Sequence, residues 1–454
     1  MKIAIVGSGI AGLAAAYGLH RHHDITVFEA DTRIGGHSHT VDVPDGYGHN
    51  VAVDTGFIVY NTHNYPNLVK LFDETHVASE ESDMSFAVSI GGGKTEYLGE
   101  PAGMFAQKRN VLRPSHWVMI RDIMRFYKNA PALKQNAESK RKTIRQVLDE
   151  GHYSNAFRYR HILPMAAAIW SMPVERVNEF PAEALISFFD NHQLFEMDLL
   201  ARPVWRTVTG GSREYVKKVT SGFHDRLFTQ SPVIKAERTP AGVRLTLGGQ
   251  VQTNAIFDEV IFACHPDQTL AILEADADPE ERAVLAGVKY EQNTAVLHSD
   301  LSHMPRRRKA WASWNYMAAR EASSEATLSP VALTYWMNRL QNLDTKEPLL
   351  VTLNPLSRPD PALTYGTFTY AHPQFSRAAL DAQQALKSIQ GRNRLWYCGA
   401  WCGHGFHEDG AASGLAVSSA LGAPPSWTST ITEMSPAAHN ATPVGKAGAR
   451  IAAE

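Results

Sequence analysis

The chain has 454 residues, of which 44% are hydrophobic and 20% are charged, and its formal net charge is -2. This is an ordinary globular composition, and the length predicts two or three packed units. The near-neutral charge gives no global field for nucleic acid, so no nucleic-acid partner is expected. We see no signal peptide and no run near the ~18 apolar residues of a membrane span, so we expect a cytoplasmic protein.

The cysteines are few. They are Cys264, Cys398 and Cys402. Three cysteines are too few for a disulfide framework and indicate a reducing compartment. Cys398 and Cys402 form a CxxxC pair, but no second pair completes a metal site, so no metal is predicted.

The first thirty residues predict a βαβ unit that binds a dinucleotide. A strand over Lys2–Val6 leads into the motif of Gly7, Gly9 and Gly12, a helix follows, and a second strand ends on Glu29. The first glycine permits a tight turn, the second lets a pyrophosphate approach the backbone, and the third packs helix against strand. The helix N-terminus attracts phosphate. Glu29 stands where a carboxylate accepts from both ribose hydroxyls, which argues against NADP.

Later elements alternate between strands and helices. Apolar periodicity predicts a strand over 49–54, helices over 100–195, paired strands around a turn at 241–242, a buried strand over 257–263, strands over 285–370, a strand over 394–399 and a small-residue helix over about 410–421. We therefore predict an α/β fold, in which a Rossmann-type domain is interrupted by an inserted α+β substrate domain.

The predicted domains are discontinuous. We expect the nucleotide-binding domain to comprise residues 1–80, 205–265 and 390–423, and the substrate domain to comprise residues 81–204 and 266–389. Beyond residue 423 the chain is rich in Ser, Thr, Ala and Pro, with few large apolar groups. That composition predicts a disordered tail over 424–454.

Several segments resemble the flavin amine oxidase and phytoene desaturase superfamily. Arg33–Thr40 is similar to its RxGGR-type loop, and Asp54–Gly56, the 258–263 strand and the 398–411 stretch resemble the same superfamily. The resemblance implies an amine-oxidase-like two-domain flavoprotein that holds FAD non-covalently, with its last helix directed at the flavin. Together with the βαβ motif it places the following residues at FAD: Gly7, Gly9, Ile10, Ala11, Gly12, Glu29, Ala30, Arg33, Gly35, Gly36, His37, Ser38, Thr55, Gly56, Phe57, Val233, Gly399, Ala400, His407, Asp409, Gly410 and Ala411.

Longer segments are similar to the flavin-containing N-terminal domain of plant cyclopropane fatty acid synthases and its stand-alone bacterial relatives. They include Asp54–Asn61, Trp311–Asn315, Thr334–Asn342 and Gly405–Gly410. The resemblance implies an oxidase or desaturase of fatty acyl chains, for example those of membrane phospholipids in cyclopropane, methyl-branched or furan fatty acid metabolism. It also implies a lipid methyltransferase as partner. Only one dinucleotide motif is present, so we expect the electrons to come from the organic substrate rather than from NAD(P)H, and to leave to O2 or another acceptor.

Two other functions stay open at this stage. One is a flavin amine oxidase acting on a small amine, and the other is a non-catalytic FAD-binding partner of a lipid methyltransferase. The amine oxidases usually place an acid after the glycine that corresponds to Gly399, whereas Ala400 and Trp401 follow it here. His407 or Phe406 takes the place of a tyrosine that walls their amine site. These departures weigh against an amine substrate.

Individual residues near the C-terminal glycine loop also have more than one possible role. His407 is the candidate catalytic base because imidazole titrates near neutrality, the alternative being a hydrogen-bonded loop histidine. Glu408 and Asp409 are expected to cap helices, since carboxylates favour a helix N-terminus. Cys398 and Cys402 are expected to be buried side chains rather than points of flavin attachment.

Residues 108–128 form a basic amphipathic segment, with Arg109, Arg113 and Arg121 among its cations. Such a segment can lie on an anionic membrane, although a domain helix with a solvated basic face has the same pattern. A second cluster, Arg306–Lys309, either joins that surface or forms a solvated loop. Peripheral contact with the inner face of the membrane is therefore the alternative to a purely cytoplasmic location.

Overall fold

The computed structural model describes residues 1–135, 142–170, 174–191, 194–195, 203–248, 254–322 and 330–427. Its first domain is built on a five-stranded sheet with the order β10-β2-β1-β14-β20, in which all neighbours are parallel. The strands are β1 (Lys2–Val6), β2 (Asp24–Phe28), β10 (Leu227–Phe228), β14 (Glu259–Phe262) and β20 (Leu395–Tyr397).

The central strand β1 is apolar because both of its faces are covered. Ile3 and Ile5 pack in the core that holds α1 (Ile10–Leu19), α2 (Pro66–Glu74), α9 (Arg213–Thr220) and α14 (His407–Ala420). Ala4 and Val6 point the other way, into the core under a three-stranded sheet and the helices beside it. These elements are β11 (Val233–Thr239), β12 (Gly242–Leu247), β13 (Asn254–Phe257), α10 (Pro266–Leu273), α11 (Pro279–Ala286) and α13 (Arg377–Ala385).

The second domain contains a mixed seven-stranded sheet with the order β19-β15-β18-β17-β16-β7-β8. Its strands are β7 (Phe86–Ile90), β8 (Thr95–Leu98), β15 (Lys289–His298), β16 (Trp314–Ala318), β17 (Val331–Trp336), β18 (Leu350–Leu353) and β19 (Thr364–Gln374), with α12 (Met337–Leu340) after β17. Neighbours are antiparallel except β7 and β16. Strands from two distant parts of the sequence thus share one sheet.

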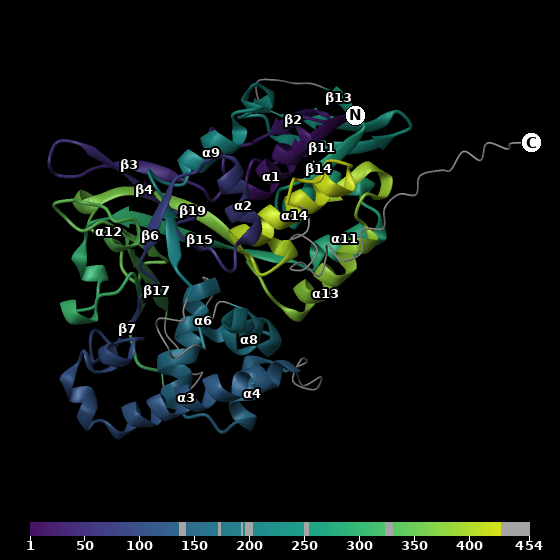
Figure 1. The fold of residues 1–454 in the computed structure, drawn as a ribbon. Helices are drawn as coiled ribbons and strands as arrows, with labels where there is room; N and C mark the ends of the chain where they lie inside the picture. The colour runs from purple at the N-terminus through teal and green to yellow at the C-terminus, as the bar shows by residue number, and fades with distance from the viewer. Residues whose placement is uncertain are drawn as a thin grey trace, which may run out of the picture.

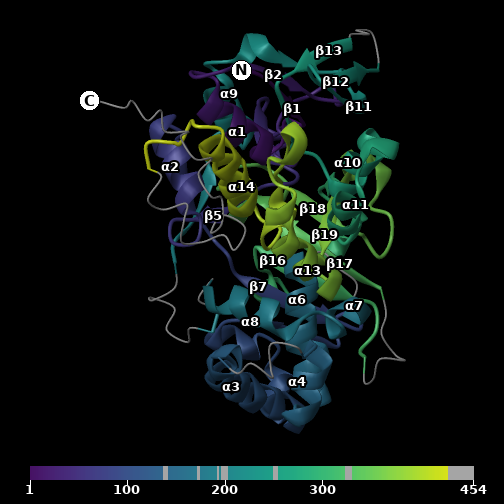
Figure 2. The same ribbon diagram turned by 90° about the vertical axis from the view of Figure 1, so that its right-hand side faces the viewer.

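A helical layer lies below the sheet in both views, with α3 and α4 farthest from the nucleotide domain (Figures 1 and 2). Its helices are α3 (Pro114–Gln135), α4 (Ile144–Glu150), α5 (Asn155–Phe157), α6 (Leu163–Trp170), α7 (Val174–Asn178) and α8 (Ala182–Asn191). Two small sheets connect the domains: β3 (Thr40–Pro44) with β4 (Asn50–Asp54), and β5 (Tyr60–Asn61), β9 (Trp205–Val208) and β6 (Ser79–Ser82).

Three details differ from the sequence predictions. The last helix begins at His407, three residues before the predicted start, because Asp409 caps it from its own first turn. The basic segment over 108–128 is interrupted, since the 3-10 turn η2 (Lys108–Leu112) ends before Pro114 starts α3. Of the predicted tail, residues 424–427 pack on the first domain, with Trp427 against Tyr17, and residues 428–454 lie outside the described part.

No helix in the described ranges combines the length and the apolar character needed to cross a bilayer.

Candidate cofactor and active site

The three glycines of the first loop meet different surroundings. A Cβ on Gly12 would lie 2.0 Å from the Gly7 carbonyl oxygen, and one on Gly7 would lie 2.9 Å from that of Ala263. A Cβ on Gly9 would meet no atom within 4 Å. Helix α1 starts directly after Gly9, and no side chain caps it. The loop therefore packs tightly at Gly7 and Gly12 and is open at Gly9. The backbone N–H groups of the first turn of α1, including those of Ile10 and Ala11, lie beside this open space.

Glu29 lies directly after β2, beside this loop. Its Oε2 accepts from the backbone N–H and the hydroxyl of Ser8 at 2.9 and 2.5 Å, and its Oε1 accepts from the N–H of Asp31 at 2.9 Å. Ala30 is exposed, and the Glu29 carbonyl accepts from Ser231, two residues before Val233 begins β11. The carboxylate is thus held at the edge of the sheet where a ribose would lie in a Rossmann site.

The loop of Arg33–Ser38 lies against the first loop. The Gly35 N–H donates to the Ser8 carbonyl at 3.1 Å, and a Cβ on Gly36 would lie 3.1 Å from the Gly9 Cα. Gly36 has φ +58°, which glycine adopts without strain. Arg33 donates to the Gly36 carbonyl at 2.7 Å and so stabilises its own turn.

His37 follows these glycines, and its Nε2 is buried without a hydrogen-bond partner among the described residues. Its ring lies 5.1 Å from that of Tyr370 and 5.3 Å from that of His372. Burial, together with the neighbouring His372 and His265, lowers the pKa of His37 well below 6.5. A neutral imidazole with a free buried nitrogen is ready to donate to an anion or a polar ligand group.

Thr55, Gly56 and Phe57 run alongside the His37 loop. The Phe57 N–H donates to the His37 carbonyl at 2.8 Å, and a Cβ on Gly56 would lie 2.2 Å from that same oxygen. The Thr55 hydroxyl lies 2.6 Å from the Tyr370 hydroxyl of β19. Only glycine at position 56 permits this approach of the two segments.

Asp54, at the end of β4, fixes where this segment lies. Its carboxylate accepts from the Thr40 hydroxyl at 2.6 Å, from the Ser212 N–H at 2.9 Å and from the Gln341 amide at 3.0 Å. Burial raises the pKa of Asp54 to about 6, although the hydrogen bonds from Thr40 and Ser212 act to lower it. One carboxyl group therefore joins three separate parts of the chain beneath the site.

Helices α1 and α14 pack closely, as both views of the fold show (Figures 1 and 2). Their small residues make this possible: a Cβ on Gly414 would lie 2.1 Å from the Ala11 carbonyl oxygen, and one on Gly18 would lie 2.0 Å from the Ser418 hydroxyl. Gly410 lies next to Ile10 and close to the N–H of Ala400. The N-termini of the two helices thus converge, which concentrates positive potential at one place.

The residues around this convergence take part in the helix contacts. Ala411 is fully buried, and Gly399 donates its N–H to the Ser413 hydroxyl at 3.0 Å. Asp409 accepts from the Phe406 N–H at 2.9 Å and so caps α14.

Glu408 caps α2 rather than its own helix. It accepts from the Asn67 N–H and the Leu68 N–H, each at 3.0 Å, and from the Asn67 side chain at 2.7 Å. Burial raises the pKa of Glu408 to about 7. Both acids are capping residues, as the sequence predicted.

His407, the candidate base, is the first residue of α14. Its ring stacks on that of Phe57 with centroids 3.7 Å apart, and its Nε2 lies 3.0 Å from the Ser38 hydroxyl and 3.2 Å from the Tyr215 hydroxyl. Burial lowers the pKa of His407 to about 3, so the ring is neutral at physiological pH. It is a hydrogen-bonded histidine, and the proposed role as a base stays a prediction.

An aromatic cluster extends from the next residue into the helical layer. The ring of Phe406 stacks on Phe188 of α8 at 4.7 Å, Phe188 lies 4.9 Å from Trp170 of α6, and Trp170 lies 4.8 Å from Phe180. We refer to Phe406, Phe188, Trp170 and Phe180 as the aromatic wall. Phe406 directly precedes His407, so this packed aromatic cluster begins beside the candidate site.

Cys398 and Cys402 are buried in this domain, and Cys264 is partly buried. Burial raises the pKa of Cys264 to about 11 and raises those of Cys398 and Cys402 as well. Protonated thiols are poor nucleophiles, so these side chains act as small apolar groups. Among the described residues no cluster of His, Cys, Asp or Glu is arranged to hold a metal ion.

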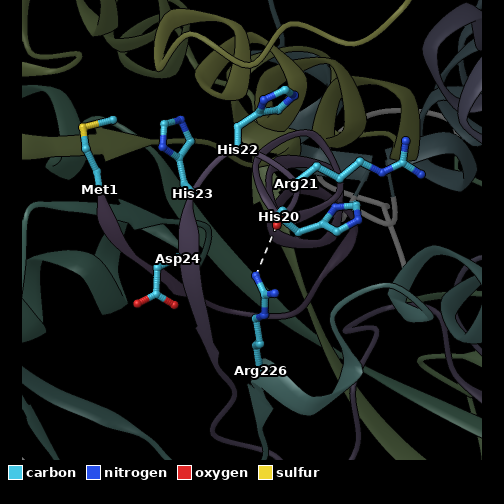
Figure 3. Close-up of a pocket in the computed structure, with 7 residues that line it drawn as sticks. All are labelled: Met1, His20, Arg21, His22, His23, Asp24 and Arg226. Carbon is cyan, nitrogen blue, oxygen red and sulfur yellow. Dashed lines mark hydrogen bonds between the residues drawn. The ribbon is translucent and has the colours of Figure 1, made fainter.

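A shallow hollow of about 440 Å³ lies elsewhere, at the amino end of the parallel sheet. Figure 3 shows Met1, Asp24 and Arg226 around it, with Arg226 bonded to the His20 carbonyl. Open α/β sheets bind their ligands at the carboxyl ends of the strands. We therefore place the functional site at the opposite edge, where the predicted residues lie.

Three observations fit a dinucleotide at that edge. They are the open space beside Gly9, the uncapped N-terminus of α1 and the buried, unpartnered Nε2 of His37. Glu29 stands at one end of the arrangement and the His407–Phe57 pair at the other. The fold and this site together define a two-domain α/β protein with a Rossmann-type nucleotide site.

Comparison with known proteins supports that class. Residues 5–75 match the family described as an NAD(P)-binding Rossmann-like domain, and no curated protein sequence matches the chain. Cyclohexylamine oxidase from Brevibacterium oxydans IH-35A is structurally similar, with a TM-score of 0.67 and 15% identity over 93% of this chain and 99% of that one. Putrescine oxidase bound to putrescine gives 0.64 and 15% over 93% and 99%.

A third similar structure is the CLA-producing fatty acid isomerase from P. acnes, with a TM-score of 0.64 and 14% identity over 91% of this chain and 96% of that one. At such identities the likeness concerns the fold. The chain has the two-domain α/β fold of these structures, with a Rossmann-type domain and a second domain built on a mixed sheet, and the predicted fold class is confirmed.

Some residues of the site were not predicted from sequence. Ser8, Tyr215 and Tyr370 each hydrogen-bond to a predicted residue. Ser8 could have been predicted, because it stands between two glycines of the motif and that motif is paired with the acid Glu29 at the end of the second strand. The other two could not have been predicted. In the sequence Tyr215 is only one residue of the apolar face of α9, and Tyr370 contacts Thr55 from a strand that lies far along the chain.

Proposed function

We propose that this protein binds FAD non-covalently and oxidises or desaturates fatty acyl chains, such as those of membrane phospholipids. The cradle around Gly9, Glu29 and His37 supports the cofactor. When bound, FAD supplies a two-electron acceptor, and a desaturation removes one hydride and one proton from neighbouring acyl carbons. O2 is the acceptor that we expect to take the electrons away.

The aromatic wall is the observation that carries the substrate class. Apolar rings extend from Phe406, the residue before His407, whereas the adjacent carboxylates, Glu408 and Asp409, accept from backbone amides. A small ammonium substrate needs an anion or a cage of rings around its charge. An acyl chain needs only apolar surface that excludes water, which this wall offers.

His407 is the side chain that we propose receives the proton. A proton held at Nε2 would be donated to the hydroxyl oxygens of Ser38 and Tyr215, which lie 3.0 and 3.2 Å away. Because burial lowers the pKa of His407 to about 3, the ring is already deprotonated across the physiological range. We therefore expect kcat/KM to show no ionisation of His407 between pH 5 and 8.

The first experiment is anaerobic bleaching of the flavin absorbance in the FAD-loaded protein. Vesicles with unsaturated, methyl-branched or cyclopropane chains are added in separate trials, and simple amines serve as the comparison. Bleaching by one lipid class and not by amines is the expected result. Bleaching by amines alone would replace the proposal with an amine oxidase. No bleaching by any of them would point to a non-catalytic partner of a lipid methyltransferase.

A variant pair tests the base. His407→Gln retains an acceptor near Ser38 but cannot hold a proton, and we expect it to slow bleaching about 10²- to 10⁴-fold. Tyr215→Phe removes one hydroxyl partner and leaves Ser38, so its effect is expected to be smaller. Equal rates in wild type and His407→Gln would remove His407 from the mechanism without touching the substrate assignment.

A further inference from the structure

The helical layer ends in a surface that the proposed function does not use. We define the basic surface as η2, the exposed face of α3 and the segment Arg306–Lys309. In both views α3 lies at the opposite end of the molecule from the nucleotide domain (Figures 1 and 2). This surface is therefore separate from the cofactor cradle.

Several large apolar side chains are exposed on η2 and α3. Fourteen exposed large apolar side chains are found on the described surface, and four of them fall within residues 111–124. Leu112 is 84% exposed, Met124 56%, Trp117 50% and Val111 48%. Single exposed apolar residues need no explanation, but a local cluster marks a place of interaction.

On α3 the exposed residues follow one stripe. Trp117, Arg121, Met124 and Lys128 are spaced by four, three and four residues, which places them on one side of a helix. The stripe thus alternates apolar groups with cations. The Trp117 indole donates to the Val111 carbonyl at 2.9 Å and so links the stripe to η2.

The charge of this region has one sign. Residues 101–128 contain six Lys or Arg side chains and one acid, Asp122. Asp122 is buried, and its carboxylate lies 3.0 Å from Arg121 and 3.4 Å from Arg125. The only carboxylate of this segment is therefore turned inward and paired.

The second basic cluster meets the first at the turn before β8. Arg109 and Arg307 both donate to the Gly93 carbonyl, at 3.4 and 3.0 Å, and Arg307 also pairs with the buried Glu96 at 2.6 Å. Desolvation, followed by the nearby guanidinium groups of Arg109 and Arg160, lowers the pKa of Arg113. Glu321, at the margin, is paired with Arg160. The two clusters that the sequence left unconnected form one crowded cationic area.

We propose that the basic surface docks on an anionic phospholipid bilayer, with Leu112 and Trp117 entering the interface and the cations lying against lipid phosphates. Arg and Lys keep their charged ends in water while their stems lie along apolar groups, which suits this boundary. Each cation near such a surface strengthens binding about fivefold. Docking goes beyond the proposed function, because it would hold whether or not acyl chains are oxidised.

The test is flotation of the FAD-loaded protein with vesicles of phosphatidylcholine alone or with added phosphatidylglycerol. We expect binding to the anionic vesicles only, and weaker binding at higher salt. Equal binding to both vesicle types, or binding to neither, would overturn the proposal. Because no substrate turnover is measured, the result does not depend on the proposed chemistry.

Variants locate the surface. Leu112→Asp and the double variant Lys108→Glu/Lys128→Glu are each expected to weaken binding more than tenfold, since all three side chains are exposed. Leu363→Asp and the double variant Lys70→Glu/Lys387→Glu make matched changes at exposed positions outside the surface and are expected to leave binding unchanged. Unaltered thermal unfolding shows that each variant is folded. Loss of binding in the controls, or full binding in the first pair, would sink the assignment.

Discussion

The cofactor cradle and the aromatic wall adjoin each other but are built in different ways. The cradle brings backbone against backbone, as between Gly36 and Gly9, within a short stretch of sequence. The wall brings side chain against side chain, as between Phe188 and Phe406, from distant segments. A close backbone approach requires glycine at fixed spacing, whereas ring packing accepts many partners. We therefore expect one added atom in the cradle to have a large effect on stability or FAD affinity, and a substitution in the aromatic wall to have a smaller effect.

The largest effect is expected from a methyl group on Gly12. Gly12→Ala would place a Cβ 2.0 Å from the Gly7 carbonyl oxygen, with backbone on both sides. We expect the free energy of unfolding to fall by about 3 kcal/mol, or folding to fail. Urea denaturation measures the change.

Gly9→Ala is the matched control for that variant. No atom lies within 4 Å of the new Cβ, and Gly9 has φ -66°, which alanine adopts freely. Stability should stay within about 0.5 kcal/mol while FAD affinity falls at least tenfold, about 1.4 kcal/mol. Undiminished FAD affinity would show that the open space beside Gly9 is not the pyrophosphate site.

A smaller loss is expected where α14 meets α2. Glu408→Ala leaves the N–H groups of Asn67 and Leu68 without their acceptor in a buried place. The free energy of unfolding should fall by about 2–3 kcal/mol. Glu408→Gln, which keeps an acceptor oxygen, should lose about half as much, and an equal loss in both variants would contradict capping as the role.

The aromatic wall should affect the substrate and not the cofactor. Phe406→Asn replaces a ring that stacks on Phe188 with a polar amide of smaller size. We expect the KM for an acyl substrate to rise about tenfold, which corresponds to about 1.4 kcal/mol, with FAD affinity unchanged. A matching loss of FAD affinity would mean that the two regions are not independent.

The smallest effect concerns pH. His37 is neutral in the free protein because burial and its histidine neighbours keep its pKa well below 6.5. A pyrophosphate bound beside Nε2 would raise that pKa, so binding takes up a proton and FAD affinity rises a few-fold as pH falls from 8 to 6. Quenching of FAD fluorescence measures the affinity, and His37→Asn should abolish the slope.

The sequence was informative where chemistry and spacing are local. The close packing at Gly7 and Gly12, the place of Glu29 after β2 and the capping role of Asp409 were predictable, because each depends on neighbours within a few residues or on one βαβ unit. Glu408 was predicted to cap a helix, but not that the helix would be α2. Nothing in the order of residues specifies that contact across the fold.

The surroundings of His407 were less predictable, because they are not local in the sequence. Phe57, Ser38 and Tyr215 surround His407, although they belong to three separate segments. Sequence patterns show that a ring or hydroxyl exists, not which partner the tertiary fold gives it. The basic character of residues 108–128 was evident from the sequence. Their contact with Arg306–Lys309 was not, because it depends on the turn at Gly93.

The packing of α1 against α14 bears on how the protein is made. At about 5–20 residues per second, the last helix leaves the ribosome roughly 20–80 s after the first. Throughout that interval the small-residue face of α1, around Ala11 and Gly18, has no partner. The nascent nucleotide domain must therefore be shielded or stay only partly folded until synthesis is nearly complete. A stop codon just before α14 would release a chain in which the small-residue face of α1 has no helix to pack against.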